Sequence, residues 1–234
     1  MKKIASLAMI FLVGLSLLFA FNDVDNNKLY LVKQIMTDKS GMITCEYYYD
    51  ENYMVRERRT STGDISDTIE EIEYDENGYQ NYQKATSKSG LVQEIYMTND
   101  NEGRILEERF VTTYNGSVTE NYLTYEYIDE NDSYIRTSHS SDIILTVTND
   151  KYGNVTKQEY NIGQSVTYEN KYEDNLLIEV TVTRTTSSLI STSVIKYEYD
   201  NLGNKTKEIT YDQYGNISIT QEYIYSSQVE FVKN

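Results

Sequence analysis

Turns that recur at short, regular intervals are the feature that most constrains how this chain can fold. Ten glycines follow the apolar N-terminal run, and all lie in turn-like clusters: Gly41, Gly63, Gly78, Gly90, Gly103, Gly116, Gly153, Gly163, Gly203 and Gly215. Segments rich in Asp, Asn and Ser fill the wider gaps, and Asn52 fills the first, so that a turn recurs about every 12 residues. Such a step holds one short strand and a tight turn, and it has no room for a helix that joins parallel strands. We therefore expect about sixteen strands, each pairing antiparallel with the next.

The composition excludes a helical bundle. The sequence has 24 Tyr, no Pro and no Trp, and Ala85 is the only alanine after the N-terminal run. A chain this poor in alanine and this rich in Tyr, Thr, Ile and Asn lacks the residues that favour helices. Its net charge of -16 would also repel nucleic-acid phosphates and anionic lipid headgroups, so nucleic acid is not an expected partner.

Side chains alternate within the predicted strands as a half-buried sheet requires. Tyr197 and Tyr199 point one way, and Lys196 and Glu198 point the other. The same alternation runs through residues 123–127 and 217–225. The pattern predicts one aromatic and aliphatic face and one charged face. Residues 104–113 contain adjacent apolar pairs instead, which predicts a bulge or burial on both faces there.

A meander of this width cannot stay flat. Sixteen strands about 4.8 Å apart would form a sheet broader than open twisted sheets usually become. We predict an all-β protein, a long antiparallel meander of about sixteen short strands that forms a curved, coiled or folded-over sheet. Closure into a barrel is a further arrangement that would accommodate so many strands. The end strands, near residues 28–37 and 221–232, would then leave unpaired edges able to pair with other copies.

An outer-membrane barrel fits this pattern less well. Its strands need about 9 to 11 residues to cross the bilayer, and its outer face must be continuously apolar. The predicted strands are shorter, the turns are equally short at both ends, and many strands lack such a face.

The N-terminus has the layout of a secretory signal peptide. Met1-Lys2-Lys3 precedes an uninterrupted apolar and small-residue run from Ile4 to Phe21, and a polar, acidic segment follows. We expect residues 1–21 to be a signal peptide and residues 22–234 a single β-repeat domain, with no membrane span after cleavage. A retained N-terminal anchor is the alternative, because the run is close to the minimum length for a span.

No residue pattern indicates catalysis, a metal site or a cofactor. Cys45 is the only cysteine, so it cannot form an intramolecular disulfide, and we expect a buried, inert thiol. His139 is the only histidine and lies in a polar turn, where it cannot build a zinc site or a catalytic triad. Aspartates in the turns near Asp100 and Asp150 could hold calcium, but they do not follow the order of a calcium loop and suit turn formation instead.

One class of turn has a recurring sequence. Examples are Tyr74-Asp75-Glu76-Asn77-Gly78, Tyr199-Asp200-Asn201-Leu202-Gly203-Asn204 and Tyr211-Asp212-Gln213-Tyr214-Gly215-Asn216. At these residues the chain resembles the YD-repeat, or RHS-like, family of secreted and surface proteins. Aspartates 50, 75, 100, 129, 150, 174 and 200 recur about every 25 residues, so a repeat is predicted to contain two strands and two turns. The resemblance implies a β-structured shell, a spacer or a surface-exposed binding module.

These observations predict an exported, non-enzymatic protein at the bacterial cell surface. A binding or structural module is the first hypothesis, with a surface protein or a glycan as partner. The alternative is a carbohydrate-binding or carbohydrate-active protein with an aromatic cleft lined by carboxylates. The candidate ligand-binding residues are the aromatic pairs Tyr197/Tyr199 and Tyr223/Tyr225, which could stack on sugar rings if their face is open.

Overall fold

The computed structural model describes residues 29–62, 68–128 and 130–232, and it is built of strands and turns. The predicted signal peptide (1–21), Gly63 and Asp129 lie outside the described residues. The strands are β1 (Tyr30–Asp38), β2 (Gly41–Tyr49), β3 (Val55–Thr62), β4 (Thr68–Tyr74), β5 (Gln80–Ser87), β6 (Val92–Asn99), β7 (Ile105–Tyr114), β8 (Ser117–Tyr127), β9 (Tyr134–Ser138), β10 (Ile143–Asn149), β11 (Val155–Tyr160), β12 (Gln164–Glu173), β13 (Leu176–Thr185), β14 (Ile190–Tyr199), β15 (Lys205–Tyr211), β16 (Ile217–Ser226) and β17 (Glu230–Phe231). No helix in the described ranges is long and apolar enough to span a bilayer.

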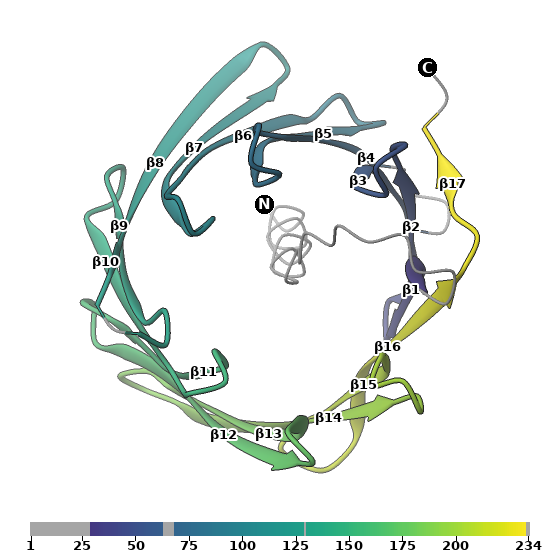
Figure 1. The fold of residues 1–234 in the computed structure, drawn as a ribbon. Coiled ribbons are helices and arrows are strands. Elements are labelled where there is room, and N and C mark those ends of the chain that lie inside the picture. The colour runs from purple at the N-terminus through teal and green to yellow at the C-terminus, as the bar shows by residue number, and fades with distance from the viewer. Residues whose placement is uncertain (1–28, 63–67, 129, 233–234) are drawn as a thin grey trace.

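The first sixteen strands form an antiparallel meander that closes on itself (Figure 1). The predicted meander is confirmed, but the expectation of a coiled or folded-over sheet is wrong, because β1 pairs with both β2 and β16. The expected free edges at the two ends are wrong for the same reason. Eight residue pairs join β1 to β16, from Tyr30 with Ser226 to Asp38 with Ile219. The short β17 adds a parallel pairing to the end of β2.

A repeated turn and bulge shapes one rim of the barrel. In the turn at Asp150, the carboxylate accepts the N–H groups of Tyr152 and Asn154 at 2.9 and 3.0 Å, and the Gly153 N–H donates to the Asp150 carbonyl at 2.9 Å. The strand that follows then shifts register by one residue, at Thr156. The same turn and shift recur after Asp50, Asp75, Asp100, Asp200 and Asp212.

Alternate turns of a meander lie at opposite ends of its strands, so the turns at Asp50, Asp75, Asp100, Asp150, Asp174 and Asp200 share one rim, whereas the Asp212 turn lies at the other. The predicted repeat of two strands and two turns is thus one step around the barrel. In the first copy, Tyr53 and not Asn52 occupies the glycine position, with a φ of 60°. Its ring stacks on Tyr30 at 5.0 Å and meets Phe231 edge-on at 5.8 Å, so contacts near the closing strands offset the backbone strain.

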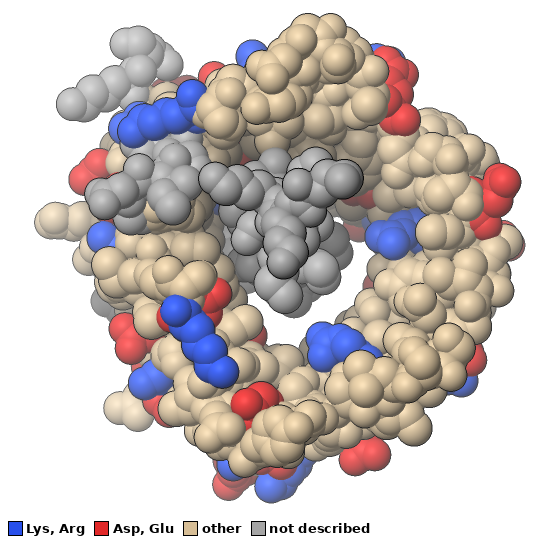
Figure 2. All heavy atoms as spheres, turned by 180° about the vertical axis from the view of Figure 1, so that it is seen from behind, with Lys and Arg blue, Asp and Glu red and all other residues tan. Residues whose placement is uncertain are grey.

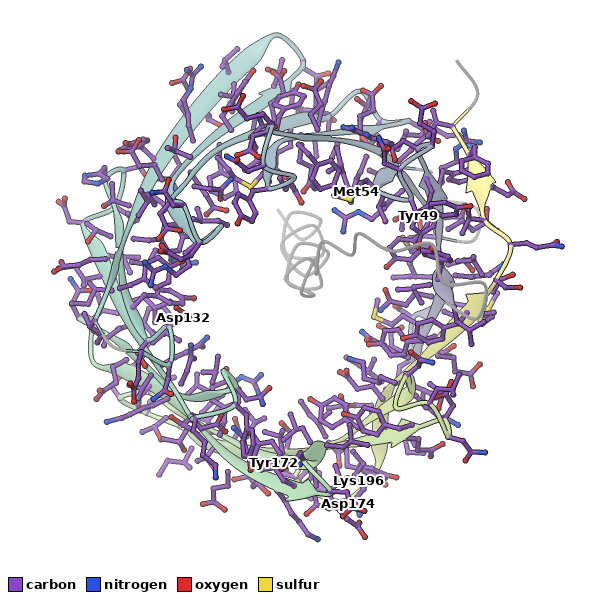
Figure 3. The ribbon with its side chains drawn as sticks, in the orientation of Figure 1. Tyr49, Met54, Asp132, Tyr172, Asp174 and Lys196 are labelled. Carbon is purple, nitrogen blue, oxygen red and sulfur yellow. The ribbon has the colours of Figure 1, made fainter. Side chains whose placement is uncertain are left out.

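The register gives the barrel two continuous walls. Residues directly opposite in an antiparallel pair lie on the same face, and this rule links Tyr47 to Arg58, Arg58 to Glu70, and so on around the ring to Gln34 and Cys45. This wall carries Tyr49, which points into the lumen in Figure 3, whereas Lys196 belongs to the other wall and points outward. With the exception of Val111, the buried strand residues all lie on the lumen wall: Tyr49, Ile72, Ala85, Glu108, Leu123, Leu145, Val147, Val180, Val182 and Gln221.

The irregular segment 104–113 shows both of the predicted departures. The register shifts at Leu106, since Thr98 faces Glu107 and Asn99 faces Ile105. Val111 is only 8% exposed although it lies on the outer wall, while Glu108 is buried on the lumen wall.

Charges are divided unequally between the two walls. Lumen charges nearly balance, with Arg58, Arg136, Arg184 and Lys205 set against Asp38, Glu70, Glu108 and Glu208. The outer wall carries most of the remaining strand carboxylates together with Lys side chains, and charged groups ring the outside of the molecule in Figure 2. The same view shows an opening through the middle of the ring of described residues.

Substitutions at two turn glycines distinguish the cost of backbone strain from the cost of a steric clash. Gly153 has a φ of 77° and nothing within 4 Å of an added Cβ, so we expect Gly153→Ala to cost about 1 kcal/mol from the left-handed backbone alone. Gly103 has a φ of 83°, and a Cβ there would overlap the Tyr79 ring, so Gly103→Ala should cost more. Urea unfolding measures both. Gly153→Asn is the control, because Asn tolerates this conformation; an equal loss for Asn and Ala would contradict the explanation.

Acid should weaken the rim turns. Partial burial tends to raise the pKa of Asp150, but the hydrogen bonds from Tyr172, Asn170 and two backbone N–H groups outweigh it and hold the pKa below its usual range. A carboxyl whose pKa is lowered by folding stabilises the fold above its unfolded pKa of about 3.9 and loses that contribution as pH falls further. We expect urea midpoints to decline below about pH 4, and Asp150→Asn to flatten part of that decline. An unchanged acid profile in the variant would argue against this role.

Candidate binding surface in the barrel lumen

The four aromatic residues singled out in the sequence meet on the lumen wall. Tyr197 and Tyr199 come from β14, Tyr223 and Tyr225 come from β16, and β15 lies between these strands. Two of the four hydroxyls hold backbone groups. Tyr199 donates to the Leu177 carbonyl at 2.8 Å, and Tyr225 donates to the Lys205 carbonyl at 3.0 Å.

These two belong to a recurring set of clamps near the Asp-turn rim. Tyr49 donates to the Leu31 carbonyl at 2.6 Å and Tyr74 to the Val55 carbonyl at 2.8 Å, each on the preceding strand. Each bond lies beyond the last backbone pair of its two strands, where the carbonyl would otherwise lack a donor from that strand. The hydroxyls of Tyr199 and Tyr225 therefore stabilise the wall itself, whereas the hydroxyls of Tyr197 and Tyr223 are not bonded to backbone carbonyls.

A lysine lies between these two rings. The Lys205 Nζ is 5.3 Å from the centroid of the Tyr197 ring and 4.5 Å from that of Tyr223, within the range of cation–π attraction. It also lies 3.2 Å from Glu208 Oε2. Sequence reasoning missed Lys205 and Glu208, because the register shift at Thr206 places both on the lumen wall and simple alternation does not reveal it.

A chain of side-chain hydrogen bonds extends this surface across the closing strands. Tyr223 donates to Gln221 Oε1 at 2.8 Å, Gln34 Nε2 donates to the same oxygen at 3.2 Å, and Tyr47 donates to Gln34 Oε1 at 2.9 Å. Tyr47, Gln34, Gln221, Tyr223, Glu208 and Lys205 thus form one connected surface over β2, β1, β16 and β15. We call this set the lumen surface.

Burial favours the neutral form of the Tyr197 and Tyr223 phenols. Desolvation, followed by the nearby Glu208 carboxylate, raises the pKa of both Tyr197 and Tyr223 well above the usual range. Both therefore remain neutral hydroxyls at physiological pH. The lumen surface offers neutral rings, amides, one cation and one carboxylate, which can bind polar groups but provide no activated nucleophile.

The lumen carboxylates are separated from one another by strand order. Glu70 is paired with Arg58 at 2.5 Å, Glu208 with Lys205, and Glu108 accepts the Tyr125 hydroxyl. They come from β4, β15 and β7, which are not neighbouring strands. Burial raises the pKa of Glu108, but no second lumen carboxylate stands on an adjacent described strand to form an acid–base pair with it.

Cys45 lies beside the polar chain of the lumen surface, directly opposite Gln34 and within hydrogen-bond reach of Tyr47, whereas His139 lies apart from it. Burial raises the pKa of the Cys45 thiol, in keeping with an unreactive group. His139 lies in the turn between β9 and β10, with its Nε2 3.1 Å from Thr124 Oγ1 and its ring 5.2 Å from that of Tyr122. Within the described ranges, no three His, Cys, Asp or Glu side chains gather closely enough to hold a metal ion.

No protein-family model matches the chain, and no curated protein does. Among solved structures, a porin-like protein from Bacteroides vulgatus aligns over 85% of this chain and 99% of its own, with 11% identity and a TM-score of 0.55. A porin-like protein from Bacteroides uniformis aligns over 84% and 96%, with 12% identity and a TM-score of 0.38. A TcdB2-TccC3-Cdc42 structure aligns over 76% of this chain and 10% of its own, with 19% identity and a TM-score of 0.35. The first of these likenesses shows the barrel fold.

The Gln221 amide should matter most where the barrel closes. Gln221→Leu leaves the Tyr223 hydroxyl and the Gln34 amide without their shared acceptor, and we expect a loss of about 2 kcal/mol. Hydrogen exchange should rise at the amides that join β1 to β16. Gln158→Leu is the control, because Gln158 accepts the Tyr168 hydroxyl at 3.1 Å elsewhere on the lumen wall. Equal exchange at the β1–β16 amides in both variants would show that Gln221 has no special role in closure.

Proposed function

We propose that this chain is an exported, non-enzymatic barrel that works in water at the bacterial cell surface as a binding or structural module. The polarity of its two walls carries the proposal. Phenols and aliphatic side chains line the inside, while Lys and Glu side chains alternate with Thr and Ile outside. A barrel surrounded by lipid needs an apolar outer band, because Lys or Arg near the bilayer midplane costs about 2 to 4 kcal/mol each.

Lysine side chains within three strands make the outer wall unsuited to contact with lipid. Lys84 lies in the middle of β5, Lys196 in the middle of β14 and Lys207 in β15, all on the outer wall. Lys196 pairs with Glu179 at 3.3 Å, and a similar pair joins Lys207 to Glu222 at 3.9 Å. Such pairs between half-exposed side chains are typical of a wall facing water.

The YD-like turns support the same assignment. The resemblance implies secreted or surface proteins built of β repeats, and here the turns that carry it lie on one rim of the barrel, except for the Asp212 turn on the other rim. Side chains of Asp, Asn and Gly at that rim suit a solvated edge.

We assign binding to the lumen. Sixteen strands spaced by about 4.8 Å and tilted by about 40° enclose a radius of about 16 Å, and barrels of that strand number leave an aqueous interior. The nearly balanced lumen charges favour an uncharged ligand over an ion. Rings and amides such as those of Tyr197, Tyr223 and Gln221 favour one with both apolar surface and hydroxyl or amide groups, as a glycan or a surface-protein segment has.

Fractionation of cells tests the environment of the barrel. The full chain, expressed with its own leader in a bacterial host, should be recovered without detergent from the periplasm, the medium or a surface wash. It should show a β-type circular dichroism spectrum there. A porin expressed in the same host is the control, since it should sediment with membranes and need detergent. If this chain is extracted from membranes only by detergent, the proposed function is wrong.

A further inference from the structure

A row of aromatic side chains crosses the outer wall, on the opposite side of the sheet from the lumen surface. The register places Tyr82 opposite Tyr96, Tyr96 opposite Arg109, and Arg109 opposite Tyr122, on four consecutive strands from β5 to β8. The His139 N–H then donates to the Tyr122 carbonyl at 2.9 Å and continues the row. We call these five residues the outer row.

Three of the four neighbouring pairs in the outer row have side chains in contact. The Tyr82 and Tyr96 ring centroids are 5.1 Å apart, the Arg109 guanidinium lies 5.2 Å from the Tyr96 centroid, and the Tyr122 and His139 rings are 5.2 Å apart. The row is open to solvent, with Tyr96 41% and Tyr122 36% exposed. At one end it borders a shallow depression lined by Arg109, Glu120, Asn121, Tyr122, His139 and Ser140.

Carboxylates fix the phenols in place. The Tyr82 and Tyr96 hydroxyls both donate to Glu94 Oε1, at 2.8 and 3.3 Å. A hydrogen bond with Glu107 is the main cause of the raised pKa of the Tyr122 hydroxyl. Because these hydroxyls are hydrogen-bonded to carboxylates of the same wall, the rings have restricted orientations before any ligand binds, which lowers the entropy cost of stacking on them.

We propose that the outer row is a binding platform for a neutral, β-1,4-linked polysaccharide. The solvent-exposed rings of Tyr96 and Tyr122 can pack against the C–H surface of sugar rings, and the carboxylates and amides beside them can accept and donate hydrogen bonds to sugar hydroxyls. Strand spacing of about 4.8 Å is close to the rise of one pyranose in an extended β-1,4 chain. Tyr96 and Tyr122, two strands apart, therefore match every second sugar, which presents the same face in such a chain.

The charged side chains beside the outer row determine which class of glycan fits it. Glu94, Glu107 and Glu120 border the row, against two cations: Arg109, which already lies 3.7 Å from Glu120, and Lys84, which lies directly opposite Glu94. This excess of carboxylate disfavours uronic acids and sulfated sugars and leaves neutral chains as the matching class. The site is on the outer wall, so it is separate from the lumen binding under the proposed function, and either can fail without the other.

Titration calorimetry on the exported full chain tests the platform. The probes are the hexasaccharides of cellulose, chitin, xylan and mannan, with a hexasaccharide of alternating uronic acid as the charged comparison. We expect at least one neutral probe to bind, and the double variant Tyr96→Ala/Tyr122→Ala to weaken that binding by at least about tenfold. Tyr96→Phe keeps the ring and should bind within about threefold of the unaltered chain.

Tyr214→Ala is the matched control, because Tyr214 is 79% exposed in the β15–β16 turn and outside the row. Circular dichroism confirms that each variant is folded. The proposal is overturned if no neutral probe binds, if the charged probe binds more tightly than all of them, or if binding survives the double variant. It is also overturned if Lys205→Ala, in the lumen, abolishes binding while the double variant does not.

Discussion

Backbone pairing between β1 and β16 is the interaction on which the rest of this structure depends. A meander of sixteen strands has two edges until these strands meet, and an open sheet of that width exposes rows of unpaired N–H and C=O groups. Once they pair, one face of every strand becomes concave and the other convex. The distinction between lumen and outer wall, and therefore between a phenol-lined interior and a charged exterior, exists only because the ring is closed.

Closure is supported by local devices that repeat around the barrel. Most of the Asp turns reverse the chain with a carboxylate that accepts backbone N–H groups, and a register shift follows in those hairpins. Such bulges increase local twist and curvature, which a closed barrel requires. Phenols then clamp adjacent strands, as Tyr199 of β14 does on the Leu177 carbonyl of β13. The tyrosines thus add to the aliphatic side chains buried on the lumen wall, because one end of the ring packs while the other end satisfies a carbonyl.

The two walls divide the chemistry of the molecule. The lumen surface gathers neutral phenols, amides and one Lys–Glu pair on β1, β2, β15 and β16. The outer row aligns four rings and a guanidinium across β5 to β9. Both arise from the same rule, that residues opposite each other in antiparallel strands share a face, but they present different shapes, a concave lining and a gently convex platform.

The sequence by itself determined the turns and the alternation. Positions such as Gly153 and Gly203 require a left-handed backbone that few other residues adopt, so the glycine spacing alone located most of the reversals and implied an antiparallel meander. Alternation likewise separated Tyr197 from Lys196. These features are local, and local rules suffice to predict them. Only the tertiary structure decided that the ends meet, that the tyrosine face turns inward, and that Tyr53 replaces a glycine beside Tyr30. It alone brought Lys205 between two rings and set Tyr82, Tyr96 and Tyr122 in one row. Those outcomes depend on cross-strand register and on bulges, which are fixed by the cooperative closure of the whole ring rather than by any single segment.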